Sequence, residues 1–335
     1  MKNKSATSDI QDISHDLEKV IEGEVKFDSF SRQLYSTDGS IYQVLPIGVV
    51  LPKSKNDVIA TIELAHKYGV SILPRGGGTS LAGSTVGNSI ILDFSKFMHN
   101  VIGLNLEEKT IKVQPGIILD ELNQFLSPNN LLFAPDPSSS NRGNIGGALG
   151  NNSCGAHSIR WGKTSDNVEK IEAILSDGSI SNLGQIELDT INQVTNPPNL
   201  LGAIINRLSE IGLHYQTEIE SRYPKLMRRV SGYNLDQLIA SNHINLAKFV
   251  VGSEGTLLTI TEAELKLVDK PTHKGLAVIH FEDLIESMEA IVPILEMDPA
   301  AVEHVGKIIL QEARKHTEYN KLMEFVSGNP ESLLI

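Results

Sequence analysis

The sequence predicts a protein of the α+β class, and three observations carry this prediction. Apolar runs and a helical pattern alternate from residue 46 to residue 73, which predicts a strand, a helix and a second strand. Two later pairs of β-rich runs, at 101–113 and 168–183, predict antiparallel hairpins. Two glycine-rich stretches, at 74–83 and 135–155, match neither pattern and predict loops that contact a ligand.

The strand–helix–strand unit at 46–73 has clear boundary signals. Ser54 predicts the N-cap of the helix, and Gly69 predicts its end. The apolar positions between them recur at helical spacing, at Val58, Ile62 and Ala65. We expect Pro74 to end the second strand, because proline cannot donate a hydrogen bond to the sheet.

The glycine-rich stretch at 74–83 predicts a cradle for an anion, and a diphosphate is its natural occupant. Three successive glycines, 76–78, allow backbone N–H groups to turn inward without side chains in the way. Thr79 and Ser80 add hydroxyl donors, and Arg75 either adds a charge or points to solvent. The spacing is neither a Walker P-loop nor a Rossmann fingerprint. A surface turn without a ligand is the alternative.

The remaining elements are predicted from shorter patterns. They are short helices at 16–22 and 118–126, strands at 89–94 and 131–133, a long helix at 200–218, and two β-rich runs between 247 and 267. The positions expected to face the interior are Ile118, Leu122, Phe125 and Leu126 in the second helix, and Leu201, Ile204, Ile205, Leu208 and Ile211 in the long helix. After Pro271, a strand at 275–281 and a helix at 284–295 begin a new unit of about 65 residues, few for an independent core.

Composition limits the classes of function. The chain has 335 residues, 40% of them hydrophobic, and its net charge of −12 argues against nucleic acid as a partner. The single cysteine, Cys154, excludes a disulfide framework and an iron–sulfur cluster ligated within this chain. No His or Cys spacing is typical of a metal site. No signal peptide and no membrane span are found, so we expect a cytoplasmic protein that has the option of peripheral membrane association.

Four motifs in order resemble the FAD-binding domain of the vanillyl-alcohol oxidase type (PCMH-type). They lie at 74–80, 136–155, 160–162 and 251–257. Among the FAD-linked oxidases, the D-lactate, glycolate and D-2-hydroxyglutarate dehydrogenase branch is the most similar. The resemblance implies two α/β subdomains that hold FAD between them, followed by the start of an α+β cap domain. The corresponding ranges are an N-terminal extension at 1–45, an FAD-binding domain at 46–270 with subdomains at about 46–100 and 101–270, and an incomplete cap or substrate domain at 271–335.

The resemblance also assigns cofactor-binding residues. The glycine loop would hold the pyrophosphate through Pro74, Arg75, Gly76, Gly77, Gly78, Thr79, Ser80 and Gly83. The second stretch would contact the nucleotide or flavin through Pro137, Ser138, Ser139, Gly146, Gly147, Asn152, Gly155 and His157. The last motif would contribute Glu254 and Gly255, and Ile260 a backbone contact to adenine or ribose. Some relatives attach FAD covalently through a histidine near the glycine loop. No histidine lies between His66 and His99, so we expect non-covalent FAD.

The activity that the resemblance implies is oxidation of a D-2-hydroxy acid such as D-lactate, glycolate or D-2-hydroxyglutarate, by hydride transfer to flavin N5. The Gly-Asp-Gly-Asn-His-type metal stretch of close relatives is not found, so catalytic residues are not assigned and no metal site is expected. For the same reason we expect the chain to be a fragment of a longer enzyme. Arg228 and Arg229 resemble a family segment near the active-site mouth, or are a solvated pair.

Two alternatives stay open at this point. One is a flavoenzyme like UDP-N-acetylenolpyruvoylglucosamine reductase, which should lack the 251–257 motif. The other is a non-catalytic FAD-binding module. Exposed apolar residues of a short cap, such as Ile291, Ile294 and Leu295, further predict a homodimer. The sequence patterns identify neither the particular 2-hydroxy acid nor the electron acceptor.

Overall fold

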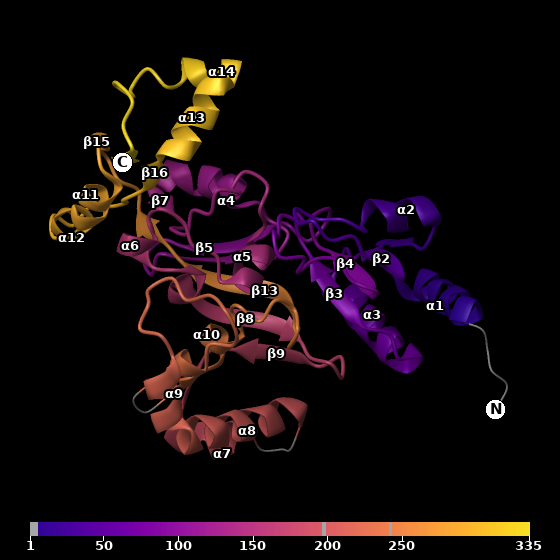
Figure 1. Ribbon diagram of the computed structural model, residues 1–335. Helices are drawn as coiled ribbons and strands as arrows, with labels where there is room; N and C mark the ends of the chain where they lie inside the picture. The colour runs from indigo at the N-terminus through magenta and orange to yellow at the C-terminus, as the bar shows by residue number, and fades with distance from the viewer. Residues whose placement is uncertain (1–5, 196–198, 241–242) are drawn as a thin grey trace.

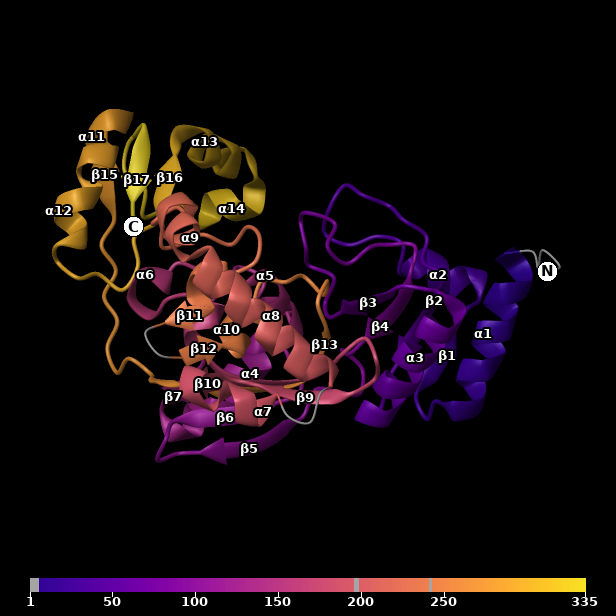
Figure 2. The same cartoon turned by 90° about the horizontal axis from the view of Figure 1, so that it is seen from below.

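The computed structural model describes residues 6–195, 199–240 and 243–335. Figure 1 shows a first body built on an N-terminal sheet, a larger central body built on a second sheet, and a small C-terminal unit beside the central body. Helix α1 (Ala6–Val20) and the C-terminal unit lie at opposite ends of the molecule in both views (Figures 1 and 2). Helices and strands follow one another in irregular order along the chain, and the strands form separate sheets, so the structure belongs to the α+β class.

The first body is a four-stranded sheet with helices packed against it. The strand order is β1 (Glu24–Lys26), β2 (Gly48–Leu51), β4 (Ile90–Asp93) and β3 (Ile72–Arg75). Strands β2, β4 and β3 are parallel, and β1 is antiparallel to β2. Helices α1 (Ala6–Val20) and α3 (Lys55–Tyr68) pack against each other, and α2 (Ser29–Leu34) follows β1. The boundary signals of α3 are confirmed, because Ser54 accepts from the N–H of Asp57 and Gly69 ends the helix at φ 65°.

The segment before residue 46 is part of this body. Helix α1 begins well before the expected short helix, and its Ile13 and Leu17 side chains are fully buried against the core of the first sheet. The carboxylate of Asp57 accepts the backbone N–H groups of Glu22 and Gly23, at 2.9 and 3.0 Å, which ties the start of β1 to α3. A domain boundary at residue 45 would divide this sheet, so we propose that the first subdomain begins with α1.

Strand β3 corrects the expectation for Pro74. The strand continues through Pro74 to Arg75, and Pro74 pairs with Leu92 of β4. Because β3 lies at the edge of the sheet, the missing N–H of proline costs no ladder hydrogen bond there. The strand therefore carries the chain two residues further, directly to the glycine loop.

The central body contains a five-stranded antiparallel sheet. The strand order is β5 (Val101–Asn105), β6 (Thr110–Val113), β13 (Thr259–Lys266), β8 (Val168–Ile174) and β9 (Ile180–Leu183). The two predicted hairpins, β5–β6 and β8–β9, are confirmed. Smaller pairings join β7 (Leu131–Leu132) to β14 (Val268–Asp269), and β10 (Gln185–Glu187) and β11 (Ile239–Ala240) to β12 (His243–Asn245). Its helices are α4 (Leu119–Leu126), α5 (Ile145–Asn151), α6 (Ser158–Trp161), α7 (Ile191–Val194), α8 (Leu200–His214), α9 (Gln216–Arg222) and α10 (Leu246–Val250).

Several elements differ from the sequence-based expectations. The stretch at 135–155 is not wholly irregular, because Ile145, Ala148 and Leu149 form the buried face of α5. The first of the two β-rich runs is the helix α10, which Asn245 caps by accepting from the N–H of Lys248. Phe125 is 48% exposed, so it is not on the buried side of α4.

The predicted helix at 200–218 is two helices, α8 and α9, and of its five expected interior positions only Ile205 is fully buried. The other four are half-buried, because α8 covers an edge of the core rather than crossing it.

A charged cluster joins the first body to the central body. Lys55, at the start of α3, lies 2.7 Å from both Glu172 of β8 and Glu262 of β13. Glu262 is almost completely buried and also pairs with Lys112 of β6. Burial alone would raise the pKa of Glu262, but hydrogen bonds from Lys112 and Lys55 outweigh burial, and its pKa is lowered. The cluster therefore connects helix α3 of the first body to the sheet of the central body.

The C-terminal unit has its own small sheet, in the order β15 (Ile279–Phe281), β17 (Ser332–Leu334) and β16 (His304–Gly306). Its helices are α11 (Leu284–Glu289), α12 (Ile291–Leu295), α13 (Lys307–Lys315) and α14 (Thr317–Lys321). The single helix expected at 284–295 is interrupted after Glu289, because Pro293 cannot donate to the carbonyl one turn earlier. Within the described ranges, no helix has both the length and the apolar character needed to cross a bilayer.

Candidate cofactor site

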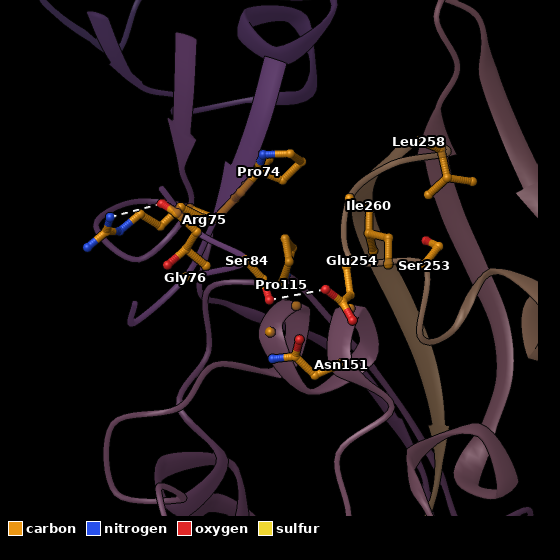
Figure 3. Close-up of a pocket in the computed structure, with 16 residues that line it drawn as sticks. Pro74, Arg75, Gly76, Ser84, Pro115, Asn151, Ser253, Glu254, Leu258 and Ile260 are labelled. Atoms are coloured by element: carbon orange, nitrogen blue, oxygen red, sulfur yellow. Dashed lines mark hydrogen bonds between the residues drawn. The ribbon is translucent and has the colours of Figure 1, made fainter. Parts of the chain in front are cut away.

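The two glycine-rich stretches meet at the seam between the first and central bodies (Figure 3). They enclose a cavity of about 80 Å³, which we call the seam cavity. The predicted site residues that line it are Pro74, Arg75 and Gly76 from the first body, and Gly146, Gly147, Glu254, Gly255 and Ile260 from the central body. Residues from five separate elements and loops are thus brought to one place.

Glycine is required where the two bodies approach each other most closely. A Cβ at Gly76 would lie 2.8 Å from Oδ1 of Asn144, and one at Gly77 would overlap the carbonyl oxygen of Arg142. Gly255 has φ 74°, and a Cβ there would lie 3.1 Å from Cδ of Pro74. Gly77 therefore faces the backbone of Arg142, whereas Gly76 and Gly255 face the side chains of Asn144 and Pro74. The missing Cβ atoms leave the backbone of these glycines open at the seam.

Two buried side-chain amides each have one atom without a hydrogen-bond partner among the described residues. Oδ1 of Asn144 lies next to Gly76, and its Nδ2 donates to the carbonyl oxygen of Gly116. Nδ2 of Asn152, the residue after the lining residue Asn151, has no partner, and its Oδ1 accepts the N–H of Ser165. An unpaired buried polar atom costs about 1–3 kcal/mol. Together with the glycine contacts, these groups fit a polar ligand that approaches the backbone closely, as the pyrophosphate of a dinucleotide does.

Arg75 lines the cavity but directs its charge elsewhere. Its guanidinium donates to the carbonyl oxygens of Tyr35, Thr37 and Thr85, at 3.2, 2.9 and 3.1 Å. In Figure 3 its side chain points away from Glu254 and Pro115. The contribution of Arg75 to the cavity therefore comes from its backbone, and its side chain fastens a segment of the N-terminal extension over the glycine loop.

That covering segment, residues 35–44, reaches the glycine loop at two more points. The N–H of Gly39 donates to the carbonyl oxygen of Gly78 at 2.9 Å. The carboxylate of Asp38 accepts from the hydroxyl of Thr85 at 2.8 Å. Hydrogen bonds at these two points and at Arg75 thus fix the segment to the glycine loop.

The other predicted residues of the glycine loop shape it rather than line the seam cavity. They are Gly77, Gly78, Thr79, Ser80 and Gly83. The hydroxyl oxygen of Ser80 accepts the N–H groups of Ala82 and Ser84, both at 3.2 Å. Ser84 then donates its hydroxyl to Oε2 of Glu254 at 3.1 Å, which links the loop to the central body (Figure 3).

The remaining predicted residues lie around a second and larger cavity. This C-terminal cavity, of about 1450 Å³, lies between the central body and the C-terminal unit. Asp136, His157, Arg160 and Trp161 line one wall, and residues 270–277, 279 and 299–303 line the other. Pro137, Ser138 and Ser139 form the turn that follows Asp136, closed by the N–H of Ser140 on the carbonyl of Pro137. Gly155 contacts Asp136 closely, because a Cβ there would overlap its carboxylate.

Arg228 and Arg229 differ in exposure, because Arg228 is exposed and Arg229 is largely buried. Arg228 donates to the carbonyl oxygen of Gly155 at 2.7 Å, beside the C-terminal cavity. Arg229 is 9% exposed, pairs with Asp236 and lies over the ring of Tyr223. Arg228 therefore supports the wall that carries His157. Among the described residues, no group of three or more His, Cys, Asp or Glu side chains is placed to hold a metal ion.

Sequence reasoning missed several residues that line the seam cavity. They are Ser84, Thr85, Phe94, Pro115, Gly150, Asn151, Ser253 and Leu258. Ser253 lies inside the 251–257 motif but was given no role, and Leu258 directly follows the motif, so a motif longer by one residue would have included Leu258. Pro115 follows β6 and carried only a turn signal. Its position depends on how the sheets pack, because the Cβ of Pro115 supports α5 at Gly146.

Comparisons with known proteins agree with this geometry. Residues 46–184 match the family described as FAD binding domain. D-2-hydroxyglutarate dehydrogenase of Pseudomonas putida is 31% identical over 92% of this chain and 31% of its own length. Glycolate oxidase subunit GlcD of Bacillus subtilis is 28% identical over 86% of this chain and 52% of its own length. The chain therefore spans about a third to a half of the length of these curated relatives.

The fold is shared with solved structures over nearly the whole chain. An alkyldihydroxyacetonephosphate synthase structure matches 97% of this chain and 55% of its own, with a TM-score of 0.66 and 20% identity. This match includes the C-terminal unit, so the observed arrangement of three parts is that of the predicted PCMH-type fold. Across residues 46–184, the chain contains a domain of the FAD binding domain family.

Proposed function

We propose that this chain binds FAD non-covalently and is the flavin-binding part of a dehydrogenase that oxidises a D-2-hydroxy acid, such as D-lactate, glycolate or D-2-hydroxyglutarate. The observation that supports the proposal is the seam cavity, where Gly76 of the first body and Gly255 of the central body line one space without side chains. Relatives of known name that match most of the chain act on compounds of this class. The flavin would accept the hydride, and the protein would supply binding and orientation.

Different groups of the predicted residues would contact different parts of FAD. The glycine loop, 74–83, would hold the pyrophosphate through its backbone, with Ser84 and Glu254 fixing the loop to the central body. Gly146, Gly147 and Gly255 would leave room for the cofactor along the seam, and Ile260 would contact it through its backbone. Asn152 offers an unpaired amide donor. The turn at 137–139, Gly155 and His157 would contact the flavin or nucleotide from the second stretch.

Titration of the purified chain with FAD tests the first part of the proposal. Quenching of flavin fluorescence and a protein-bound absorbance band are the expected results. A sample that stays colourless and takes up no added FAD contradicts the proposal. Anaerobic mixing of the loaded protein with D-lactate, glycolate and D-2-hydroxyglutarate then tests the activity. Bleaching of the flavin absorbance by one of these acids supports a dehydrogenase. FAD that is bound but is reduced by none of them supports the alternative of a non-catalytic FAD-binding module.

We also propose a cytoplasmic location and a homodimer. Of the three residues expected to be exposed, Leu295 is 45% exposed, whereas Ile291 and Ile294 are half-buried. The C-terminal unit also exposes Val292 on α12 (64%) and Met297 after it (81%). Apolar surface of this kind favours association. Light scattering at high micromolar concentration should give twice the chain mass of 36.5 kDa. A single-chain mass at that concentration excludes the dimer.

A further inference from the structure

The C-terminal cavity contains a histidine held in one orientation by a carboxylate. Nδ1 of His157 lies 2.5 Å from Oδ2 of Asp136, and the backbone N–H of His157 donates to Oδ1 of the same residue at 3.2 Å. A carboxylate only accepts hydrogen bonds, so the neutral imidazole carries its proton on Nδ1. Nε2 then keeps its lone pair, and it has no hydrogen-bond partner among the described residues.

The surroundings fix this pair in place. Gly155 permits the approach, because a Cβ at that position would overlap Oδ1 of Asp136. The guanidinium of Arg228 donates to the carbonyl oxygen of Gly155. The backbone N–H of Gly155 donates to the hydroxyl oxygen of Ser158 at 3.0 Å. The ring of Trp161 stacks on the imidazole, with 5.5 Å between centroids and 27° between planes. Side chains from three segments thus limit His157 to one rotamer, as a group that exchanges protons with a ligand requires.

The position of the pair also suits an acidic ligand. His157 and Asp136 are each about a third exposed, so they border the cavity rather than lie inside the wall. Arg160 lines the same wall, three residues after His157, and Lys274 lines the opposite one. An arginine and a lysine facing one cavity match the carboxylate of a 2-hydroxy acid.

We infer that His157, positioned by Asp136, accepts the hydroxyl proton of the substrate in the C-terminal cavity. This inference rests on the proposed function. Bound oxidised flavin would accept the hydrogen and electron pair of the substrate C–H bond as hydride, while the O–H bond would give its proton to Nε2 of His157 and the carbon–oxygen double bond of a 2-oxo acid would form. The products would be the 2-oxo acid, reduced flavin and an imidazolium whose charge Asp136 balances.

The first test measures the protonation of the ring without turnover. Two-dimensional ¹⁵N NMR of the FAD-loaded chain at pH 8 should show the His157 proton on Nδ1. Addition of 2-oxoglutarate or oxalate, as carboxylate probes, should shift the Nε2 resonance. In Asp136→Asn the side-chain amide can donate to Nδ1, so the proton should move to Nε2. A proton on Nε2 in the unaltered chain, or resonances that neither probe moves, overturns the inference.

The second test separates binding from proton transfer. His157→Asn keeps a donor toward Asp136 but removes the base, so kcat for flavin reduction should fall about 10²- to 10⁴-fold, with KM changed less than about threefold. His66→Asn, an exposed histidine on α3, is the matched control and should leave kcat unchanged. Asp136→Asn should also lower kcat, because it fixes the wrong tautomer. A His157→Asn variant with unaltered kcat overturns the inference.

The two proposals fail in different ways. A chain that takes up no FAD contradicts the proposed function whatever His157 does. A chain that binds FAD but reduces it with none of the three acids contradicts the proposed substrates, and the NMR response to 2-oxoglutarate then decides the role of His157 alone. His157→Asn removes one of the proposed cofactor contacts, so its kcat is compared at a saturating FAD concentration, where the fall in kcat should remain. A variant that regains full kcat at saturating FAD shows that His157 acts only as a cofactor contact, and overturns the inference.

Discussion

Gly147 and Arg75 show how single residues define the seam. Gly147 lies on α5 with open space where a Cβ would stand, so that space belongs to the seam cavity. Arg75 was expected either to meet an anion or to face solvent. Its guanidinium does neither, because a largely buried guanidinium must satisfy its donors, and three carbonyl oxygens of the N-terminal segment and Thr85 are within reach.

Replacing Gly147 with alanine should separate fold stability from cofactor binding. Alanine favours a helix by about 0.5–1 kcal/mol over glycine, so the melting temperature without FAD should stay equal or rise. The added methyl group enters the seam cavity, and we expect the Kd for FAD to rise at least about tenfold, or about 1.4 kcal/mol. Fluorescence titration and thermal melts measure both. Gly103→Ala, at an open position on β5, should leave the Kd for FAD unaltered. An equal rise of the Kd in Gly103→Ala would contradict the explanation that the methyl group at position 147 occupies the seam cavity.

At the scale of elements, the seam depends on how α3, β8 and β13 are held together. Lys55 sits at the N-terminal end of α3 and crosses to two glutamates on neighbouring strands. Thr261 donates to Oε1 of Glu172 at 2.9 Å, which orients one of these carboxylates. The cluster joins the first body to the sheet that carries Ile260, so it helps to set the width of the seam.

Lys55→Met should destabilise the chain more than the loss of a surface ion pair does. It leaves the buried Glu262 with only Lys112 as a partner, and Lys55 itself is partly exposed, so we expect a loss of about 1–2 kcal/mol. Lys67→Met removes an exposed pair with Asp16 and should cost at most about 0.5 kcal/mol. Urea unfolding at pH 7 gives both values, and equal effects would show that the cluster adds nothing beyond surface charge.

The cluster also predicts how stability changes with pH. The folded-state pKa of Glu262 lies below its ordinary value of 4.5. The ionised carboxylate therefore stabilises the fold above about pH 5, and this contribution is lost as the pH falls through the folded-state pKa. Glu262→Gln should have a lower urea midpoint at pH 7 and a smaller further loss between pH 7 and pH 4. Glu107→Gln, on an exposed turn, should keep the pH dependence of the unaltered chain.

At the scale of the whole molecule, the two cavities belong to different pairs of parts. The seam cavity is lined by residues no later than Ile260, and the C-terminal cavity requires residues from 268 to 335. The molecule thus separates the place proposed for the pyrophosphate from the place proposed for the acid. His157 and Asp136 belong to the central body but face the C-terminal unit.

A shortened chain of residues 1–270 should keep FAD binding and lose the acid site. The first and central bodies have their own buried clusters, and β14 still pairs with β7 in this chain. We expect the Kd for FAD within about threefold of the full chain, since no later residue lines the seam cavity. The response to 2-oxoglutarate should disappear. A shortened chain that melts cooperatively but no longer binds FAD would place part of the cofactor site in the C-terminal unit.

The sequence by itself determined the local features whose causes lie within a few residues. The cap at Ser54, the stop at Gly69, the turn at 177–178 and the glycine loop all follow from backbone preferences that neighbouring residues set. These preferences predicted the α+β class. The family resemblance that the order of the motifs carries added the PCMH-type fold and half of the residues that line the seam cavity.

Only the tertiary structure decided what depends on residues far apart in the chain. Pro74 belongs to a strand because β3 lies at a sheet edge, and Arg75 turns from the seam because residues 35–37 cover it. Asp136 becomes the partner of His157, 21 residues later, because Gly155 lets the two segments touch. Buried polar groups must find partners wherever packing brings them, and packing over such separations leaves no local pattern in the sequence.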